Sequence, residues 1–294
     1  ITGTPEQTGA TTVTITANDG AAQVSDMFAI NVTADQDAVM AKFAGRIDLE
    51  ALETYINPAV PDYFRAPNTV LNPVTDKGAT LGRVIFYDDD LSVTGFVACA
   101  TCHVQANAFS EGDDTPTSQG IFGEFTGRSS TRLVNTLYGE EERFFWDERA
   151  ENMEDQVTKP FKDHNEHGFS GEMGRPDFDD MMAIMQADAA YRELFRFVFL
   201  DETITEERIQ SALAQFVHSI VSFDSKYDTG RAAVADDMDP FPNFTADENA
   251  GKNLFMRPAA ANDGAGCSSC HVPPEFAIQM DIAVTAAVSA RKMR

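Results

Sequence analysis

Basic side chains are scarce in this chain, which has 22 Lys and Arg residues against 47 Asp and Glu residues and a formal net charge of -25. Such an excess of negative charge repels nucleic acids and anionic membrane surfaces, and it favours a basic or neutral partner. Long apolar runs are absent too, since no window approaches the roughly 18 to 20 consecutive apolar residues of a membrane span. We therefore expect neither a nucleic-acid partner nor a membrane span.

An initiator methionine and a signal segment are also missing, because the chain opens at Ile1 with no charged stretch before an apolar one. We therefore expect a processed form or a fragment.

Tryptophan occurs once, yet 22 Phe residues and a hydrophobic content of 43% supply the material for a buried core. The length of 294 residues predicts about two domains at ~150 residues each.

Cysteine is sparse as well, and none is left over once two motifs are counted. The four cysteines form Cys99-Ala100-Thr101-Cys102-His103 and Cys267-Ser268-Ser269-Cys270-His271. The CxxCH pattern is typical of c-type haem attachment, in which two thiols add to the porphyrin vinyl groups and the adjacent histidine ligates the iron. The sequence therefore predicts two covalently bound c-type haems, with His103 and His271 as the iron ligands.

A disulfide pair, a redox dithiol and a four-cysteine zinc site are the alternatives for these cysteines. A zinc site needs no histidine directly after both pairs, and a redox dithiol needs only one CxxC. Haem is attached to c-type cytochromes on the far side of the energy-transducing membrane. The resemblance to that class therefore implies a periplasmic or exported, cell-surface location.

Residues 1–37 differ in pattern from the remainder of the chain. Polar and apolar residues alternate over 11–16 and 28–33, around a turn signal at Asn18-Asp19-Gly20, which predicts a β-hairpin. The stretch resembles the closing strands of immunoglobulin-like or cadherin-like repeats of bacterial surface proteins. Two or three strands cannot form a stable sandwich, so we expect residues 1–37 to be the remnant of an upstream domain.

From about residue 38 onward, apolar residues recur at helical spacing, which predicts a mainly α fold. We expect helices over 75–87, over 177–199 with a break near Asp188, and over 209–221.

Two further residues bear on the helical part. Thr245 followed by Glu248 matches a capping box and predicts a helix toward Phe255, before the second CxxCH motif. His218 lies beside an apolar helix face, and we expect it to be an ordinary surface or boundary histidine.

Short motifs follow one another in order around the two CxxCH sequences. They are Leu81-Gly82-Arg83-Val84-Ile85-Phe86-Tyr87-Asp88, Ala108-Phe109-Ser110, Ser118-Gln119-Gly120, Leu133-Val134-Asn135, Phe144-Phe145-Trp146-Asp147-Glu148-Arg149, Met153-Glu154-Asp155-Gln156, Pro160 and Gly251-Lys252-Asn253-Leu254-Phe255. Over about residues 58 to 277 this series resembles the bacterial di-haem cytochrome c peroxidases and their relatives, the methylamine-utilisation di-haem proteins.

The resemblance implies a mainly helical protein with two c-type cytochrome-like haem domains. By this analogy residues 38–224 hold the peroxidatic haem, and residues 225–294 form a truncated domain whose haem receives electrons. The resemblance also implies hydrogen peroxide as substrate and a small c-type cytochrome or cupredoxin as electron donor, and a homodimer is a further expectation. Trp146 occupies the position of the family's bridging tryptophan, which carries electrons between the haems.

Peroxide cleavage needs a group that takes a proton from the near oxygen and returns it to the departing oxygen. In the family this group is a glutamate, located after a glutamine and a proline that Gln156 and Pro160 match here. Glu166 falls at the family spacing, whereas Glu172, in a literal Glu-Met-Gly, lies six residues further on. We expect Glu166 to be the acid–base group and Gln156 to be a second hydrogen-bonding group in the distal pocket.

Three features depart from the family's pattern. Ile121 stands where the reductively activated peroxidases have a histidine that plugs the distal site, so we expect an open peroxidatic haem. Ser129 replaces an asparagine that helps to hold calcium, which leaves calcium only as a candidate ion. The axial Met or Tyr of the second haem has no positional match, since the chain stops at Arg294 and only Met280 and Met293 offer sulfur ligands there.

The leading prediction is a cytochrome-c peroxidase, and two rival functions stay open. A non-enzymatic di-haem electron carrier would have two six-coordinate haems and would not react with peroxide. An oxidase of a protein or other organic substrate, like the methylamine-utilisation relatives, would be favoured by a tyrosine ligand on the second haem.

Overall fold

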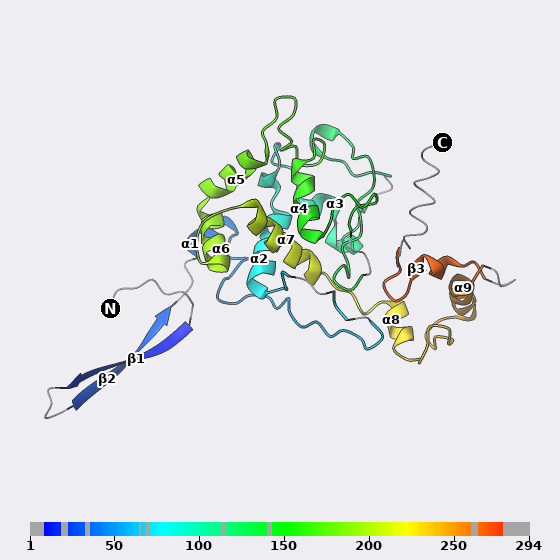
Figure 1. The fold of residues 1–294 in the computed structure, drawn as a ribbon, viewed down its shortest axis with the longest axis horizontal. Helices are drawn as coiled ribbons and strands as arrows, with labels where there is room; N and C mark the ends of the chain where they lie inside the picture. Colours follow the sequence, from blue (N-terminus) through cyan, green and yellow to red (C-terminus); the bar gives the residue numbers. More distant parts are fainter. Residues whose placement is uncertain are drawn as a thin grey trace.

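The structure is a computed structural model, and it describes residues 9–18, 23–32, 36–64, 66–68, 71–112, 116–139, 143–259 and 264–278. Helices predominate in these ranges, which confirms the predicted mainly helical fold (Figure 1). The helices are α1 (Asp37–Lys42), α2 (Asp76–Tyr87), α3 (Cys99–Cys102), α4 (Met153–Lys162), α5 (Phe178–Ala187), α6 (Ala189–Phe199), α7 (Glu206–Ser219), α8 (Lys226–Arg231) and α9 (Ala246–Met256). The strands are β1 (Gly9–Asn18), β2 (Gln23–Val32), β3 (His271–Val272) and β4 (Ala277–Ile278).

Polar side chains cap the helices close to where the sequence predicted their ends. At the start of α2 the Thr75 hydroxyl accepts a hydrogen bond from the Gly78 amide at 3.0 Å. Asp188 ends α5, and its carboxylate accepts a hydrogen bond from the Ala190 amide at 2.8 Å at the start of α6. The predicted break near Asp188 is confirmed.

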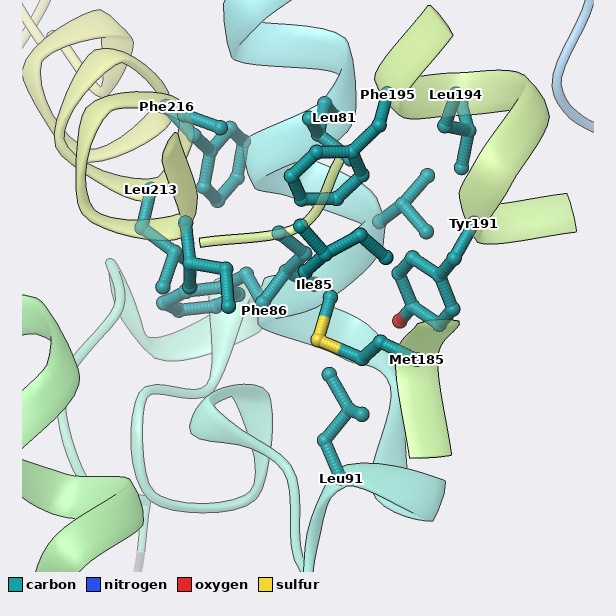
Figure 2. Packing of buried hydrophobic residues seen from close by; sticks show 14 of the residues in the cluster. Leu81, Ile85, Phe86, Leu91, Met185, Tyr191, Leu194, Phe195, Leu213 and Phe216 are labelled. Carbon is teal, nitrogen blue, oxygen red and sulfur yellow. The ribbon is translucent and has the colours of Figure 1, made fainter. Parts of the chain in front are cut away.

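The hydrophobic core lies where α2 packs against α6 and α7, and where α7 packs against α4. Gly82 allows the close approach of α2 and α7, because a Cβ at this position would lie 2.0 Å from the Ala212 carbonyl oxygen. Figure 2 shows part of this core, in which side chains of α2, α5, α6 and α7 and Leu91 of the turn after α2 meet: Leu81, Ile85, Phe86, Leu91, Met185, Tyr191, Leu194, Phe195, Leu213 and Phe216.

One face of α7 carries polar residues that are nevertheless buried. Gln215 accepts hydrogen bonds from the Thr75 amide at 2.9 Å and from the Thr75 hydroxyl at 2.8 Å. His218 is only 5% exposed, and its Nδ1 has no hydrogen-bond partner among the described residues. The prediction of a surface or boundary histidine is therefore wrong. It failed because α7 packs on two helices at once, which buries more of its surface than its apolar stripe indicates.

The N-terminal strands form a two-stranded antiparallel sheet that projects from the helical body (Figure 1). Gly9 lies opposite Val32, and Asn18 lies opposite Gln23. The assignment of residues 1–37 to an immunoglobulin-like or cadherin-like repeat stays a prediction, and the turn residue Asp19 lies outside the described residues.

The C-terminal elements α8, α9 and β3 gather at the end of the molecule away from this sheet (Figure 1). α9 begins with the predicted capping box, since the Thr245 hydroxyl accepts from the Glu248 amide at 3.2 Å and the Glu248 carboxylate accepts from the Thr245 amide at 2.7 Å. The domain limits at residues 37 and 224 stay predictions. Among the described helices, none combines the length and the apolar character that crossing a membrane requires.

Candidate active site

The first CxxCH motif folds as one short helix. α3 contains both cysteines, and at its start the Thr101 hydroxyl accepts a hydrogen bond from the Ala98 amide at 3.0 Å. His103 follows directly, and its amide donates to the Cys99 carbonyl at 3.0 Å. About one helical turn therefore carries both thiols and the imidazole on a single segment.

The His103 ring is held by a backbone carbonyl. Its Nδ1 lies 3.0 Å from the Phe109 carbonyl oxygen, and burial lowers the pKa of the imidazole. Ala108 and Phe109 both have positive φ, at 56° and 59°, so the chain turns back toward the ring at this point. A neutral ring that donates through Nδ1 keeps the lone pair of Nε2 for a metal, which is the usual arrangement of a metal-ligating histidine.

A cavity of about 380 Å³ adjoins this motif. Its volume falls within the ~300–1,000 Å³ of ordinary ligand and cofactor sites. The structure brings to this one cavity the first motif and all three residues that the sequence predicted to be catalytic. Its lining includes Phe86, Cys99, Cys102, His103, Ser129, Trp146, Arg149, Gln156, Pro160, Glu166, His167, Leu213 and Val217.

Both cysteines of the motif lie in the cavity wall, and neither is paired in a disulfide. Burial raises the pKa of Cys99 to about 12 and that of Cys102 to about 11, and nearby carboxylates, Glu166 among them, add to both effects. A redox dithiol needs a thiol whose pKa is lowered toward neutrality. The electrostatics therefore argue against a redox dithiol, and the paired thiols with the oriented imidazole in one cavity fit a haem.

Glu166 carries a carboxyl group that titrates near neutrality. Burial, and to a smaller extent the charge of Asp163, raise its pKa to about 7, while the charge of Arg149 acts in the opposite direction. A group with a pKa near the working pH can both accept a proton and return it. Glu172, by contrast, is exposed and does not line the cavity. Of the two candidate carboxyl groups, Glu166 is the one that lies in the cavity wall beside the first motif, and its role as the acid–base group stays a prediction.

The loop that carries Glu166 is held by the Ser-Gln-Gly element. The Ile121 amide donates to the Asn165 carbonyl at 3.0 Å. A Cβ on Gly120 would lie 1.8 Å from the same oxygen, so the approach requires glycine. On the other side, one carboxylate oxygen of Asp163 accepts from the Asn165 amide at 2.8 Å and from the Glu166 amide at 3.2 Å.

His167 is a second histidine of the cavity lining, and it anchors the same loop. It is 2% exposed, its Nδ1 lies 2.8 Å from the Leu91 carbonyl oxygen, and its ring centroid is 4.4 Å from that of Phe161. Burial lowers the pKa of His167 to about 4, so the ring is neutral at physiological pH. The side chain next to Glu166 is therefore fixed by a hydrogen bond and by aromatic packing.

Gln156 and Trp146 meet the cavity in different environments. Gln156 lies on α4 and is 9% exposed, whereas Trp146 is 52% exposed. The Trp146 indole donates a hydrogen bond to the Ser129 carbonyl at 2.9 Å. Ser129 is the position that the resemblance pairs with the calcium-holding asparagine, and its carbonyl oxygen therefore already accepts a hydrogen bond. Among the described residues, none of the second CxxCH motif lines the cavity. The bridging role of Trp146 and the binding of calcium therefore stay predictions.

The second CxxCH motif shares with the first a histidine whose Nδ1 faces a backbone carbonyl, although its local fold differs. Cys267–Ser269 form a 3-10 turn, and His271 Nδ1 lies 3.3 Å from the Phe276 carbonyl oxygen. Phe276 also has a positive φ, of 54°. The axial candidates Met280 and Met293 lie outside the described residues.

Sequence reasoning missed the groups that orient these side chains. The carbonyls of Phe109 and Phe276 hold the two motif histidines. The sequence signal that could have identified them is a phenylalanine after each histidine, six residues on in the first motif and five in the second. Gly120 was identified only as part of a motif, and no local pattern linked Arg149 to Glu166. Such pairings depend on loops that meet only in the folded chain.

Comparison with known proteins identifies the family of this chain. Residues 76–234 match the family model described as di-haem cytochrome c peroxidase. The methylamine utilization protein MauG of Methylophilus methylotrophus is 31% identical over 215 residues, which cover 72% of this chain and 56% of that protein. The cytochrome c551 peroxidase of Nitrosomonas europaea is 28% identical over 208 residues, which cover 71% of this chain and 55% of that protein.

A solved structure supports the same relationship at the level of the fold. The crystal structure of a MauG-like protein associated with microbial copper homeostasis has a TM-score of 0.59 and 25% identity, over 77% of this chain and 62% of that chain. The chain belongs to the di-haem cytochrome c peroxidase family, whose members are haem-containing redox enzymes. It spans about half the length of the relatives it matches, and the family match ends before the second CxxCH motif.

Proposed function

We propose that the protein is a di-haem c-type peroxidase that reduces hydrogen peroxide to water at the haem of the first motif. The observation that carries this proposal is the position of Glu166, a carboxyl group with a pKa of about 7 that shares one cavity with Cys99, Cys102 and His103. Membership of the family supports haem as the cofactor, and the two CxxCH motifs supply thiols for two covalent attachments.

The residues of the cavity divide the chemistry among them. Thioethers to Cys99 and Cys102 and the Nε2 atom of His103 would hold the haem, whose iron supplies the electrons that break the peroxide O–O bond. Glu166 accepts the proton of the near oxygen and returns it to the departing oxygen, so that water leaves rather than hydroxide. Gln156 offers a second hydrogen-bonding group that orients the peroxide.

The first site is proposed to be open without prior reduction. Ile121 is 1% exposed and has no atom that can ligate iron, and its neighbour Gly120 is tied to the Glu166 loop. His167 also lines the cavity, and its Nε2 atom is the group that a bis-imidazole haem at this site would have to recruit. A six-coordinate bis-imidazole spectrum of the oxidised protein would contradict this part of the proposal.

Two electrons and two protons convert one peroxide into two waters. We propose that the electrons come from a small c-type cytochrome or cupredoxin, enter at the haem of His271 and pass through Trp146. The net charge of -25 favours a basic donor, and association should weaken as salt is added. Covalent haem attachment also supports a periplasmic or exported location.

A second candidate function, which the resemblance to the methylamine-utilisation proteins implies, is the oxidation of a protein or other organic substrate. The half-exposed Trp146 favours it, because an indole that reaches both the cavity and the surface can exchange electrons with a docked macromolecule. Under this function the oxidation of a reduced small cytochrome would be slower than the consumption of peroxide.

The test is stopped-flow absorption of the protein with both haems attached, mixed with hydrogen peroxide and a reduced c-type cytochrome. We expect a rapid change of the haem spectrum and oxidation of the cytochrome. Glu166→Gln should slow the peroxide step by ~10²- to 10⁴-fold, and Glu172→Gln should leave it unchanged.

The other outcomes separate the candidate functions. Loss of reaction only in Glu172→Gln would overturn the assignment of Glu166. No reaction in the unaltered protein would indicate an electron carrier, and fewer than two haems per chain by pyridine haemochrome analysis would overturn the di-haem proposal.

A further inference from the structure

Two tyrosines near the second motif donate hydrogen bonds to carboxylates. The Tyr227 phenol donates to Asp237, and the Tyr63 phenol donates to Asp228 at 2.9 Å. Arg231 joins the two pairs, because its Nε lies 3.0 Å from an Asp237 oxygen and its guanidinium lies over the Tyr63 ring, 5.1 Å from the centroid. The two phenols, two carboxylates and one guanidinium form a single cluster between α8 and the loop of Tyr63.

An aromatic series connects Tyr227 to the second motif. The Tyr227 and Phe276 ring centroids are 4.9 Å apart. The Phe276 and Phe255 centroids are 5.7 Å apart, and the Phe255 and His271 centroids are 6.5 Å apart. Phe276 also contacts His271 directly, since its carbonyl lies 3.3 Å from Nδ1. One residue therefore separates Tyr227 from the proposed ligand of the second haem.

The carboxylate contact decides what the Tyr227 phenol can do. Loss of an electron makes a phenolic proton strongly acidic, so oxidation proceeds readily only when a base takes the proton at the same time. Asp237 already accepts that proton's hydrogen bond. Burial and then the hydrogen bond to Asp237 raise the pKa of Tyr227 well above its usual value, so the proton stays on the phenol until the electron leaves.

We propose that Tyr227 is a redox-active residue that gives one electron to the oxidised haem held by His271 and its phenolic proton to Asp237. The phenolic O–H bond would break, its electron would pass to the haem that His271 would hold, and the products on the chain would be a neutral tyrosyl radical and a protonated Asp237 carboxyl group. The oxidising equivalent comes from hydrogen peroxide, which the proposed function reduces at the first motif, and it would reach the second motif through Trp146, so the inference rests on the proposed function.

Tyr63 provides the next position for the radical. Its own carboxylate partner, Asp228, is 7% exposed and is held by the Ser225 hydroxyl at 2.5 Å. An electron from Tyr63 restores Tyr227 while Asp228 takes the Tyr63 proton and Asp237 returns its own. The pair thus moves an oxidising equivalent away from the haem when no electron donor is bound.

Tyr87 offers a matched control within the same chain. Its ring centroid is 5.3 Å from that of Phe86, which is 6.3 Å from that of His103, so Tyr87 also stands one residue away from a proposed haem ligand. Its phenol, however, donates to the side-chain amide oxygen of Gln105 at 2.9 Å. An amide is a far weaker base than a carboxylate, so the proposal predicts no radical on Tyr87.

The experiment is freeze-quench EPR of the di-haem protein mixed with hydrogen peroxide in the absence of donor. We expect a radical signal that narrows when the protein carries ring-deuterated tyrosine. Tyr227→Phe keeps the ring contacts and should lose the signal of the earliest samples, and Asp237→Asn should lower the radical yield because it removes the base. Tyr87→Phe should leave the signal unchanged.

Each contrary outcome has a distinct meaning. An early signal that persists in Tyr227→Phe, that disappears in Tyr87→Phe, or that does not respond to ring deuteration would overturn the inference and leave the peroxidase proposal intact. A radical yield that is unchanged in Asp237→Asn would overturn the role of Asp237 as the base, and with it the inference. Haem absorption that does not change on addition of peroxide would overturn the proposed function together with this inference.

Discussion

The pH dependence of the peroxide reaction tests the role of Glu166 directly. With a pKa of about 7, Glu166 is ionised in about one tenth of the molecules at pH 6, in about half at pH 7 and in about nine tenths at pH 8. Because the ionised form takes the proton, the second-order rate constant for peroxide should rise by about tenfold between pH 6 and pH 8. An ordinary glutamate would be ionised throughout this range and would give a flat profile.

The same carboxyl group affects stability in a predictable direction. Its pKa in the folded protein is raised from 4.5 to about 7, so folding favours the neutral form. The stability that the neutral form contributes is complete below pH 4.5 and is lost as the pH rises to about 7. Removing the charge with Glu166→Gln should therefore raise the free energy of unfolding at pH 8, by at most about 3 kcal/mol, and should change its pH dependence between these two values.

The assay measures the stopped-flow rate constant from about pH 5.5 to about pH 8.5 at constant ionic strength, which spans the expected midpoint. The unaltered protein and Glu172→Gln should share a midpoint near 7, whereas Glu166→Gln should give a low and flat profile. A midpoint near 4.5 in the unaltered protein would refute the argument from burial. A midpoint near 7 that survives in Glu166→Gln would refute the assignment of the group.

Further predictions concern the surroundings of the site and the core. Arg149→Gln should move the midpoint to higher pH in the same assay, because the charge that lowers the pKa of Glu166 is removed; an unmoved midpoint would contradict that interaction. Gly120→Ala should slow the peroxide reaction at unchanged haem content, because its Cβ would displace the loop of Glu166. In thermal unfolding, Gly82→Ala should destabilise the protein by ~1–3 kcal/mol, whereas Gly251→Ala, which has open space in α9, should stabilise it by ~0.5–1 kcal/mol. Equal effects of the two would contradict the close packing of α2 on α7.

The elements that the sequence predicted well are those that depend on neighbouring residues. α2 and α9 begin where Thr75 and Thr245 cap them, and α5 gives way to α6 at Asp188. A cap or a helical stripe involves residues within one or two turns, so its signal is contained in a short stretch of sequence.

The burial of individual histidines was beyond such local signals. His218 was expected at the surface or its boundary, and the structure buries it because α7 packs against α2 and α4. His167 is fixed by Leu91, a residue 76 positions away. Neither environment follows from helical spacing, because each depends on which distant segment covers the side chain.

The sequence by itself determined that two thiols and an imidazole lie on one short segment, because the CxxCH spacing places them there wherever that segment lies. Only the tertiary structure decided which carboxyl group lies beside them. Glu166 and Glu172 are chemically identical, and the fold buries the first beside Asp163 and Arg149 while it leaves the second exposed. The pKa of a carboxyl group depends on the water that is removed from around it and on the charges brought close to it, and both are set by packing.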